Sequence, residues 1–464
     1  VHYCEENTIC DLYGGGNGKY DNFYNNPSLA YMHITKRPVQ NKTFVDINMD
    51  NGGYIGMAFG GGNQATVNYS EVMLRNVGEI DSVFAGGNSA TVVTSAHVTC
   101  SLSTTNVLTA TGRKHGRKVN VAYLCGGNIQ ADMAILPRLD LASGIFGKVF
   151  GGGNAGAMTG LHNTVRDKDN EIVPNLSTYI LVNSVNVTVR EAMFGGCNHA
   201  DVRGGTFIEV RQTSPKPSGT PEDDSYGIYQ LFGGNDIADK VKGTARIDLR
   251  GGIVHKMYGG SNGYYYYEPN NNRNNAYVVD ADGNKTSTLV AAYVTGRPEV
   301  NETQVNVWGG TVNNSIYGGG YAGDCGTTHV VVNDLSLEEN APEGTNTVTI
   351  NGKIYGGGYG VLEYVKNGLP HVGNVTTAAY TDLYKVKTLQ DAYVYGGGYG
   401  DDVQDAFLTV HENWNQELTA LYGGCYGSDV LGTTTVNMEC AAPSIASKYN
   451  VKTIYGGNDF TGIY

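Results

Sequence analysis

The side chains that could bind a ligand most readily form a run of aromatic and amide residues: Tyr264, Tyr265, Tyr266, Tyr267, Asn270 and Asn272. Successive side chains of an extended segment point to opposite sides, so about half of these rings should be exposed. Exposed rings pack on the apolar faces of sugars, and amide groups bond to sugar hydroxyls. We therefore predict a carbohydrate-binding loop here. The alternative is a loop that packs its tyrosines on a neighbouring hairpin.

Two other groups have the oxygen-rich side chains of a calcium site: Asp280, Asp282 and Asn284 in one, and Asp401 and Asp402 in the other. Calcium prefers carboxylate and amide oxygens. The first group has its glycine at the fourth position of the loop, whereas an EF-hand needs it at the sixth. We therefore predict that the chain needs no cofactor and that these groups are solvated turns; the alternative is that one of them binds calcium.

Three short motifs match catalytic or nucleotide-binding patterns but stand in the wrong context. The sequence "GGSNG" (259–263) matches the G-x-S-x-G pattern, with Ser261 as the nucleophile. Ser261, however, takes the place that glycine holds in other copies of a repeated phrase. The sequences "GGGNAG" (151–156) and "GGGYAG" (318–323) match G-x-G-x-x-G, but neither opens a helix in a βαβ unit. We expect none of them to carry chemistry.

Polysaccharide hydrolysis needs two carboxylates about 5–10 Å apart. Glu209 and Asp248 are a candidate pair, because we place both at outward positions of neighbouring repeats, although many other acidic residues are placed in the same way. A lyase acting on an acidic sugar also needs a basic residue near its base. The one dense basic stretch, "GRKHGRK" (112–118), has the glycines of an exposed loop. We therefore predict no catalytic residue and leave the enzyme class open.

A phrase of two or three glycines led by an aromatic residue recurs along the whole chain. Its aromatic (or Leu) position falls at Tyr13, Phe59, Phe84, Leu124, Phe150, Phe194, Phe232, Tyr258, Tyr317, Tyr355, Tyr395, Tyr422 and Tyr455. The shortest spacings between copies are 25, 26, 26 and 27 residues. A fixed period of this length indicates a repeat architecture, in which longer spacings carry insertions.

The residues before each phrase alternate between apolar and polar types, as in "ARIDLRGGIVHKMY" (245–258). Alternation of period two indicates strands, and Gly-Gly between them indicates tight turns. Helical periodicity is nearly absent. We therefore predict an all-β chain that forms one continuous right-handed parallel β-helix over residues 1–464, a single solenoid of about 13 coils. The left-handed form ranks behind it, because it favours hexapeptide repeats and shorter coils.

Stacked repeats place each residue on its own copy in the next coil, roughly 4.8 Å away. The aromatic residues should then form an internal stack of rings, and the glycines a corner too tight for side chains. The asparagines that close the phrases should form a ladder of amides: Asn17, Asn63, Asn88, Asn128, Asn154, Asn198, Asn235 and Asn262. Tyrosine takes over this position in the later copies, and Asn458 restores it.

These phrases resemble the V-Y-G-G-G-N repeats of large surface proteins from gut-type Gram-negative anaerobic bacteria. The resemblance covers nearly the whole chain and implies a parallel β-helix. It implies no particular activity, because such helices occur in pectate-lyase-like enzymes, phage tailspikes and adhesin stalks alike.

Repeats longer than about 27 residues carry the insertions, which we place near 18–42, 101–120, 161–178, 211–227, 263–302 and 361–380. Three of them look like β-hairpins, at 164–173, 276–294 and 361–372. They follow the glycine phrase by similar distances, so we expect them on one side of the solenoid, where repeat proteins often bind their partners. The alternative is that they only shield its flank.

Charge and chain ends limit the partners. A net charge of −13 leaves no basic surface for nucleic acid or an anionic membrane, and no apolar stretch reaches the ~20 residues of a membrane helix. The chain begins at Val1 and stops at Tyr464, just after a glycine phrase, so we predict a piece of a longer protein with further coils or domains. We expect an extracellular or cell-surface location.

Eight cysteines occur without a C-x-x-C pair. Cys4 with Cys10, and Cys425 with Cys440, could close small loops, or all could be free thiols.

Three functions follow from these observations. The first is a bacterial surface or secreted structural and adhesive solenoid, a rigid rod whose insertions contact a glycan or a protein. The second is a polysaccharide-degrading enzyme, either a pectate-lyase-like lyase or a glycoside hydrolase. The third is a passive envelope scaffold that assembles with itself.

Overall fold

The computed structural model describes most of the chain, and it divides into two compact units, Val1–Gly205 and Thr206–Tyr464. The described residues are 8–18, 40–49, 53–102, 119–213, 226–264, 277–279, 285–289, 297–362, 370–412, 414–439 and 451–460. Within them the elements are 26 strands and one 3-10 helix, Leu335–Leu337. The prediction of an all-β chain is confirmed. No described helix is long and apolar enough to cross a membrane.

Two kinds of strand alternate along each unit. We call a strand that ends at the aromatic residue of a glycine phrase a corner strand, the three residues after it the corner, and the intervening strands flank strands. In the first unit the corner strands are β1 (Thr8–Tyr13), β3 (Tyr54–Phe59), β5 (Glu79–Phe84) and β7 (Val121–Cys125), and the flank strands are β2 (Gln40–Asn48), β4 (Val67–Asn76) and β6 (Val92–Ser101). The long strands β8 (Arg138–Phe150) and β9 (Leu176–Phe194) contain both parts.

The second unit repeats this alternation. Its corner strands are β11 (Ile228–Phe232), β16 (Ile316–Tyr317), β19 (Ile354–Tyr355), β22 (Tyr393–Tyr395), β24 (Leu418–Tyr422) and β26 (Val451–Tyr455). Its flank strands are β10 (Gly205–Gln212), β15 (Glu299–Val312), β17 (Asp324–Asn333), β20 (Val375–Lys385), β23 (Ala406–Val410) and β25 (Thr434–Met438), while β12 (Lys240–Tyr258) contains both parts. Two short strands, β18 (Val348–Ile350) and β21 (Thr388–Leu389), extend a third row from β15.

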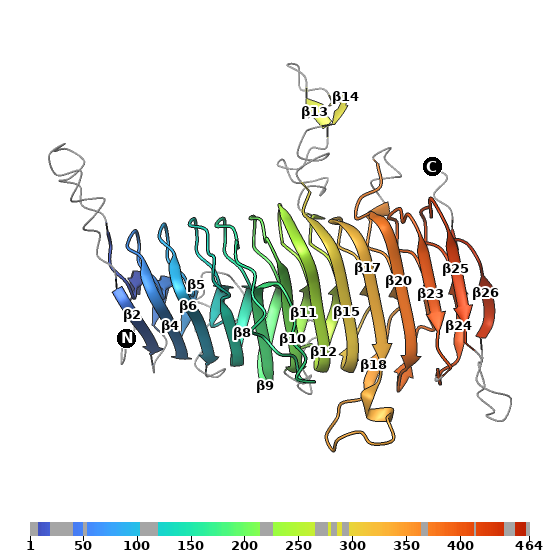
Figure 1. Ribbon diagram of the computed structural model, residues 1–464, viewed down its shortest axis with the longest axis horizontal. Coiled ribbons are helices and arrows are strands. Elements are labelled where there is room, and N and C mark those ends of the chain that lie inside the picture. The colour runs from blue at the N-terminus through green and yellow to red at the C-terminus, as the bar shows by residue number, and fades with distance from the viewer. Residues whose placement is uncertain are drawn as a thin grey trace. The chain divides into compact units, whose positions relative to one another are not determined.

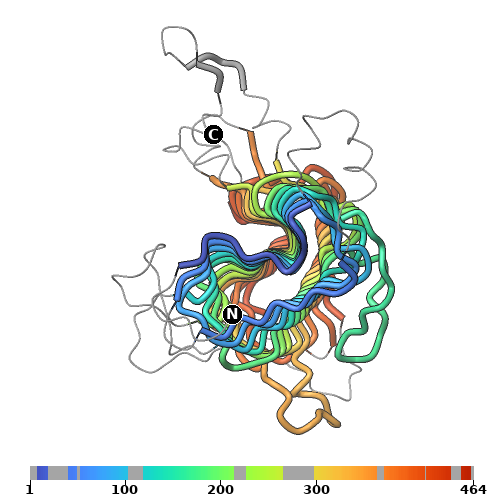
Figure 2. Tube along the Cα trace, turned by 90° about the vertical axis from the view of Figure 1, so that its left-hand side faces the viewer, coloured from blue at the N-terminus to red at the C-terminus, as the bar shows by residue number. Residues whose placement is uncertain are grey.

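Each strand pairs in parallel with the equivalent strand of the next repeat. In the first unit β3 pairs with β5 and β4 with β6, so that Phe59 lies level with Phe84 and Val72 with Val98. In the second unit β15 pairs with β17 and β17 with β20. Figure 1 shows these strands side by side within each unit, and the end-on view shows successive repeats overlying one another (Figure 2).

Segments that leave this pattern pair in antiparallel fashion. In the first unit, bridges join His162 to Leu176 and Arg166 to Ile172, in the segment where the sequence predicts a hairpin. In the second unit β13 (Tyr277–Val279) pairs with β14 (Lys285–Leu289). Most of the third predicted hairpin, at 361–372, lies outside the described residues.

The core of each repeat lies between its corner and its flank strand. A Cβ built on Gly318 would lie 2.9 Å from a methyl carbon of Val330 and 2.1 Å from the carbonyl oxygen of Gly356 in the next repeat. Val330 itself is fully buried. Gly318 therefore has to be glycine, because backbone of the next repeat and a core side chain fill the space that a Cβ would take.

The aromatic residues stack ring on ring along each unit. In the second unit the row is continuous, with centroids 4.7–5.0 Å apart and planes within 12°: Phe232, Tyr258, Tyr317, Tyr355, Tyr395, Tyr422 and Tyr455. In the first unit the stack is interrupted, because Cys125 lies level with Phe84 and Phe150. The assignment of Leu124 to this position was wrong. Leu124 is a fully buried core residue of the preceding position.

Amide-to-amide bonds join only some of the asparagines of the predicted ladder. Asn63 donates to Asn17 over 2.7 Å, Asn88 donates to Asn63 over 2.9 Å, and Asn198 donates to Asn154 over 2.7 Å. These asparagines follow three corner residues. They form a ladder because equal positions of neighbouring repeats are close enough for their side chains to bond.

Asn128 and Asn235 depart from the ladder, because only two residues, and not three, separate each of them from the residue that lies level with the rings. Each asparagine then occupies the third corner position and is fully buried. Asn128 accepts a hydrogen bond from the backbone N–H of Gly87 over 2.8 Å, and Asn235 donates to Ala238 over 3.1 Å. Asn262 stands at the ladder position but donates to Asp236 over 2.8 Å. These three residues therefore contribute no amide-to-amide rung.

A buried hydroxyl closes each of several corners, a feature that the sequence analysis missed. In the second unit the Oγ1 atoms of Thr206, Thr303 and Thr328 lie 2.5–2.6 Å from the first carbonyl oxygen of the next corner. In the first unit Thr43, Ser70 and Thr178 each donate to the corresponding carbonyl oxygen, that of Gly60, Ala85 and Gly195 respectively. Each stands two residues before a buried Val or Ile, so the pattern [ST]-x-[VI] was the available signal.

Thr328→Val tests this hydroxyl. The change keeps the shape of the side chain but leaves the carbonyl of Gly356 without its 2.6 Å donor. We expect the free energy of unfolding to fall by about 1–2 kcal/mol in urea titrations. Thr435→Val, on the exposed side of β25, is the matched control and should change it little. Equal stability of the two variants would show that the hydroxyl is dispensable.

Candidate functional site

Tyr264 belongs to a second row of rings, which stands at the ladder position of the second unit. Its ring stacks on Tyr321 with centroids 4.7 Å apart, and Tyr359, Tyr399 and Tyr426 continue the row at 4.9–5.0 Å. Burial raises the pKa of the Tyr321 hydroxyl, which keeps it neutral. The other predicted sugar-binding residues lie outside the described residues: Tyr265, Tyr266, Tyr267, Asn270 and Asn272.

The second row of rings limits how a sugar could bind there. A sugar packs on the face of an aromatic ring. Tyr399 stacks nearly in parallel on Tyr359 and on Tyr426, so both of its faces are already covered. Tyr399 therefore offers its edge and hydroxyl rather than a face.

The two predicted calcium ligands that the structure describes do not form one site. Asp401 is fully buried, and one of its oxygens accepts a hydrogen bond from the backbone N–H of Gly358 over 2.8 Å. Asp402 is partly exposed and lies 3.6 Å from the imidazole of His371. The described residues contain no group of three acidic, His or Cys side chains that could hold a metal. Asp280, Asp282 and Asn284 lie outside them.

Asp401→Asn should change how stability depends on pH. Burial raises the pKa of the Asp401 carboxyl well above its ordinary value. Folding therefore favours the protonated acid, and this contribution is lost as the pH rises from about 4 through the folded-state pKa. We expect thermal unfolding from pH 4 to 7 to show a smaller decline for the variant, which carries a neutral side chain, and a higher midpoint at neutral pH.

Asp140→Asn is the control with the opposite sign. Burial raises the pKa of the Asp140 carboxyl, but hydrogen bonds from His97 and Arg138 outweigh this and lower it. Its contribution is present above about pH 4 and lost on acidification. The same pH slope in Asp401→Asn as in the parent chain would contradict the assignment of Asp401.

Glu209 and Asp248 are brought together in the second unit, as direct neighbours in the register of β10 and β12. Ile208 and Ile247, the residues before them, are fully buried core residues, so the two carboxylates lie on the opposite, outer face of the sheet. Both carboxylates are nevertheless completely buried. The pair predicted for acid–base chemistry is therefore adjacent but closed to solvent.

Three arginines surround this pair. Arg211 lies 2.8 Å from Glu209, and Arg246 makes two hydrogen bonds of 2.7 and 2.9 Å to Asp248. Arg250 lies 3.6 Å from each of the two carboxylates. Three guanidinium groups from β10 and β12 thus face two buried carboxylates, and Arg211 and Arg246 are partly exposed, with side-chain exposures of 31% and 17%.

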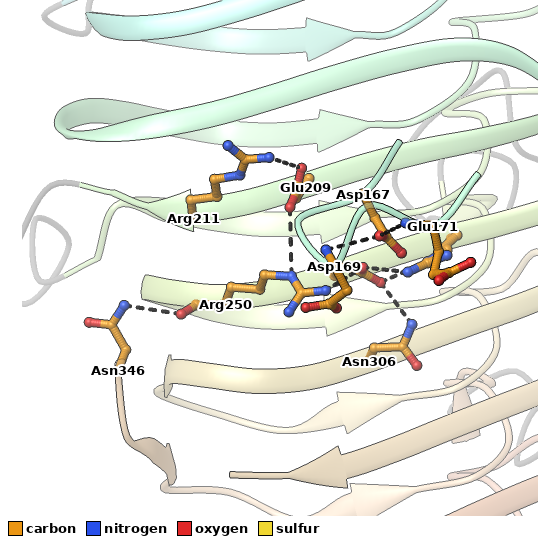
Figure 3. Close-up of polar contacts among 10 residues, drawn as sticks. Asp167, Asp169, Glu171, Glu209, Arg211, Arg250, Asn306 and Asn346 are labelled. Carbon is orange, nitrogen blue, oxygen red and sulfur yellow. Dashed lines mark hydrogen bonds and ion pairs between the residues drawn. The ribbon is translucent and has the colours of Figure 1, made fainter. Parts of the chain in front are cut away.

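Two amides complete the cluster. Asn306 of β15 donates to Asp248 over 2.7 Å, and Asn346 donates to the backbone carbonyl of Arg250 over 3.0 Å (Figure 3). A general acid must reach the oxygen that it protonates. Because Glu209 and Asp248 are buried and engaged by arginines, this arrangement suits an ion-pair network that holds neighbouring repeats together better than it suits catalysis.

A separate turn in the first unit is built on Asp167. Its carboxylate accepts hydrogen bonds of 3.0 Å from the backbone N–H groups of Asp169 and Glu171 (Figure 3). Asp167 is buried, and Asn170 adopts the left-handed conformation with a φ of 66°. The short side chain of aspartate closes turns in this way, so the carboxylate has a structural use.

A partly exposed acid–base cluster, not predicted from the sequence, lies on the outer face of the second unit. His411 lies 2.9 Å from Asp382 through Nε2 and 2.8 Å from Glu439 through Nδ1. Its ring stacks on Tyr384, with centroids 3.8 Å apart. Asp382 and Glu439 therefore lie on opposite sides of one imidazole, with side-chain exposures of 32% and 44%.

The same outer face carries a row of rings. His329 stacks on Tyr380 with centroids 4.8 Å apart, and Tyr380 stacks on Phe407 at 5.0 Å. The next residue in register after Phe407 is Thr435. Threonine has no ring to continue the stack, so Phe407, which is partly exposed, ends the row of rings.

The described cysteines are free thiols: Cys10, Cys100, Cys125, Cys197, Cys325 and Cys425. Burial raises the pKa of Cys100, Cys125 and Cys325, which makes these thiols poor nucleophiles. Cys425 is buried as well, and Cys4 and Cys440, the partners considered for loop-closing disulfides, lie outside the described residues.

The described geometry contains structural networks and a partly exposed acid–base cluster around His411, and its glycine phrases form the corners between strands. No protein-family model, curated protein or solved structure matches this chain.

Proposed function

We propose that this chain is a structural and adhesive β-solenoid of a bacterial surface or secreted protein, and that its outer face contacts a glycan or a protein. The observation that carries the proposal is the use of the repeated residues. The stacked rings, the corner glycines, the threonine hydroxyls and several asparagines all join one repeat to the next. A chain whose regularly repeated residues mainly connect one repeat to the next is suited to be a stiff, extended scaffold.

We further propose that the repeats wind as a right-handed parallel β-helix. Alternate strands pair in parallel, as β3 with β5 and β4 with β6, so every pair is joined by a crossover that contains the intervening strand. Crossovers between parallel strands of one sheet are right-handed in nearly all proteins. The location at a cell surface rests on the resemblance of the phrases alone.

The outer face of β17, β20 and β23 is the contact surface that we propose first. Phe407 is a partly exposed ring at the end of the row, and Tyr380 and His329 have polar ring atoms beside it. An apolar ring flanked by hydrogen-bonding groups suits a sugar ring. The tyrosine-rich insertion that begins at Tyr264 is the second candidate, and calcium at 280–284 would be part of it.

Size-exclusion chromatography tests this function. The purified chain is incubated with plant, host and bacterial polysaccharides, with and without calcium, and the lengths and elution positions of the polysaccharides are compared. We expect at least one polysaccharide to elute with the protein at its original length. Phe407→Ala or Tyr265→Ala should reduce this co-elution, whereas Phe44→Ala, an exposed ring in the first unit, should not.

A polysaccharide-degrading enzyme is the second candidate, and one observation favours it. Asp382 and Glu439 flank His411 on a partly exposed face, which is the kind of residue set that acid–base cleavage of a sugar chain uses. In the same experiment, shortened polysaccharide that is lost in Glu439→Gln would establish this activity. If no polysaccharide elutes with the protein and none is shortened, the self-assembling scaffold is the function to pursue.

A further inference from the structure

The corner strands of the second unit carry partly exposed side chains between buried aliphatic ones. In β12 these are His255 and Lys256, and the residues on either side of them are fully buried. Equivalent stretches of the neighbouring repeats are partly exposed as well. We call six of these residues the lysine strip: Tyr229, His255, Lys256, Asn314, Lys353 and Tyr393.

The register of the strands aligns the two lysines of the strip. Met257 pairs with Ile316, and Ile316 pairs with Ile354. Lys256 directly precedes Met257 and Lys353 directly precedes Ile354, so the two lysines hold equal positions two repeats apart. At one strand spacing per repeat, their backbones are roughly 10 Å apart. The strip therefore carries positive charge at a regular interval along the unit.

Neither lysine of the strip forms an ion pair with a carboxylate among the described residues. Lys385 of the same unit, by contrast, forms an ion pair of 2.9 Å with Glu338. The ammonium group of Lys353 lies over rings instead, 5.1 Å from the ring centroid of Tyr393 and 5.7 Å from that of Tyr426. Both charges are therefore available to an external anion.

Lys256 is also partly removed from water. Burial lowers the pKa of its ammonium group, because the charged form loses solvation. Burial and the neighbouring charge of Lys256 lower the pKa of His255 as well, which keeps that imidazole neutral at neutral pH. A cation that is partly desolvated and lacks a counter-charge is stabilised by an anion that binds beside it.

Aromatic rings accompany both lysines. His255 stacks on Tyr229 with centroids 5.0 Å apart and planes within 5°, and Tyr393 lies beside Lys353. Rings of this kind pack on the apolar faces of sugars, and the amide of Asn314 suits sugar hydroxyls. The strip thus combines the groups that bind sugars with groups that bind acids.

We propose that the lysine strip binds an acidic polysaccharide, which lies along the second unit across successive repeats. Its acidic groups would pair with Lys256 and Lys353, and its sugar rings would contact the aromatic side chains. A polysaccharide fits because it also repeats its charge at a regular interval. The net charge of −13 repels polyanions at long range, so the attraction has to come from such a local match. The inference rests on the proposed function and adds the class of glycan.

Binding of the full chain to immobilised polysaccharides in calcium-free buffer tests the proposal. The acidic probes are polygalacturonate and dextran sulfate, and their neutral counterparts are methyl-esterified polygalacturonate and dextran. We expect at least one acidic probe to bind about tenfold or more tightly than its counterpart, and this binding to weaken as salt is raised. The probe that binds shows whether the strip takes carboxylate or sulfate groups.

Lys256→Gln and Lys353→Gln should each weaken this binding about tenfold, as expected for the loss of a hydrogen bond to a charged group. Lys387→Gln is the matched control, because it removes the charge of an exposed lysine of the same unit outside the strip. It should bind like the parent chain. The thermal midpoints of all three variants should equal that of the parent, which separates lost binding from lost folding.

Three results would overturn the lysine strip as an acidic-glycan site. Full affinity in both strip variants, or equal binding of acidic and neutral probes, would leave the proposed function standing and return the glycan to the face that carries Phe407. Equal affinity for a DNA duplex would show that the strip binds any polyanion. No binding to any of these probes would reject the strip, while the wider polysaccharide panel would still decide the proposed function.

Discussion

Gly319→Ala is expected to lower the free energy of unfolding by about 3 kcal/mol, the upper end of what overpacking usually costs. A Cβ at this position would lie 2.8 Å from the Cα and 2.9 Å from the nitrogen of Gly358 in the next repeat. Both are backbone atoms of a hydrogen-bonded corner, so they cannot move aside as a flexible side chain would. The second corner position is glycine in all thirteen phrases, which is the sequence counterpart of this contact.

Gly457→Ala is the matched control for this prediction. Gly457 holds the same corner position in the last repeat, and a Cβ there would meet no atom within 4 Å. Its thermal midpoint should equal that of the parent chain, whereas Gly319→Ala should unfold roughly 6–12 °C lower. Equal midpoints for the two variants would show that glycine is not needed for close contact between repeats.

Asp248→Asn is expected to cost about 3–5 kcal/mol, because it leaves buried guanidinium groups without a compensating charge. Asp248 is fully buried and receives two hydrogen bonds from Arg246 and one from Asn306. With an amide in its place, three arginines would face the single carboxylate of Glu209. Urea unfolding followed by circular dichroism measures the loss, which should depend only weakly on salt because the two carboxylates are completely buried.

Two comparisons make this prediction specific. Asp140→Asn removes a carboxylate that also bonds an arginine, but its side chain and that of Arg138 are 24% and 49% exposed. Pairs of this kind contribute about 1 kcal/mol or less. The double variant Arg246→Met with Asp248→Leu removes both charges together and should recover most of the stability. A double variant as unstable as Asp248→Asn would contradict the ion-pair explanation.

The sequence predicted those parts of the fold in which a residue interacts with the residue at the same position of the neighbouring repeat. A ring on a regular period stacks on its own copy, and an alternating segment pairs with its own copy. The ring row from Phe232 to Tyr455 follows from spacing alone, and so does the adjacency of Glu209 and Asp248.

The misassigned positions arose from counting the phrase from its glycines. In "LCGGN" the two glycines hold the first and second corner positions, so Cys125 is the residue that lies level with the rings and Asn128 turns into the corner. Counting from the buried aliphatic residue before the aromatic position would have found both. The number of glycines varies between phrases, whereas the alternation of the strand does not.

The outer-face clusters could not be predicted, because they depend on side chains that meet across several repeats. The register of β20, β23 and β25 aligns Asp382 with Thr409 and Asn437. His411 comes two residues after Thr409, and Glu439 comes two residues after Asn437, so both lie near the end of β20 that carries Asp382. Insertions of unequal length separate these strands in the sequence, so their register is not visible without the structure. The burial of Glu209 and Asp248 was missed for a related reason: outward positions were assumed to face solvent.

Hydrogen exchange at the corners tests the central claim most directly, namely that the glycine phrases are the joints between stacked repeats. The amides of Gly318 and Gly319 donate over 2.9 Å to carbonyl groups of the next repeat. They should exchange as slowly as the amides of β17, while those of Gly456 and Gly457 in the last repeat exchange quickly. Rapid exchange at every corner, with protection confined to the flank strands, would show that the phrases are open loops and would contradict the claim.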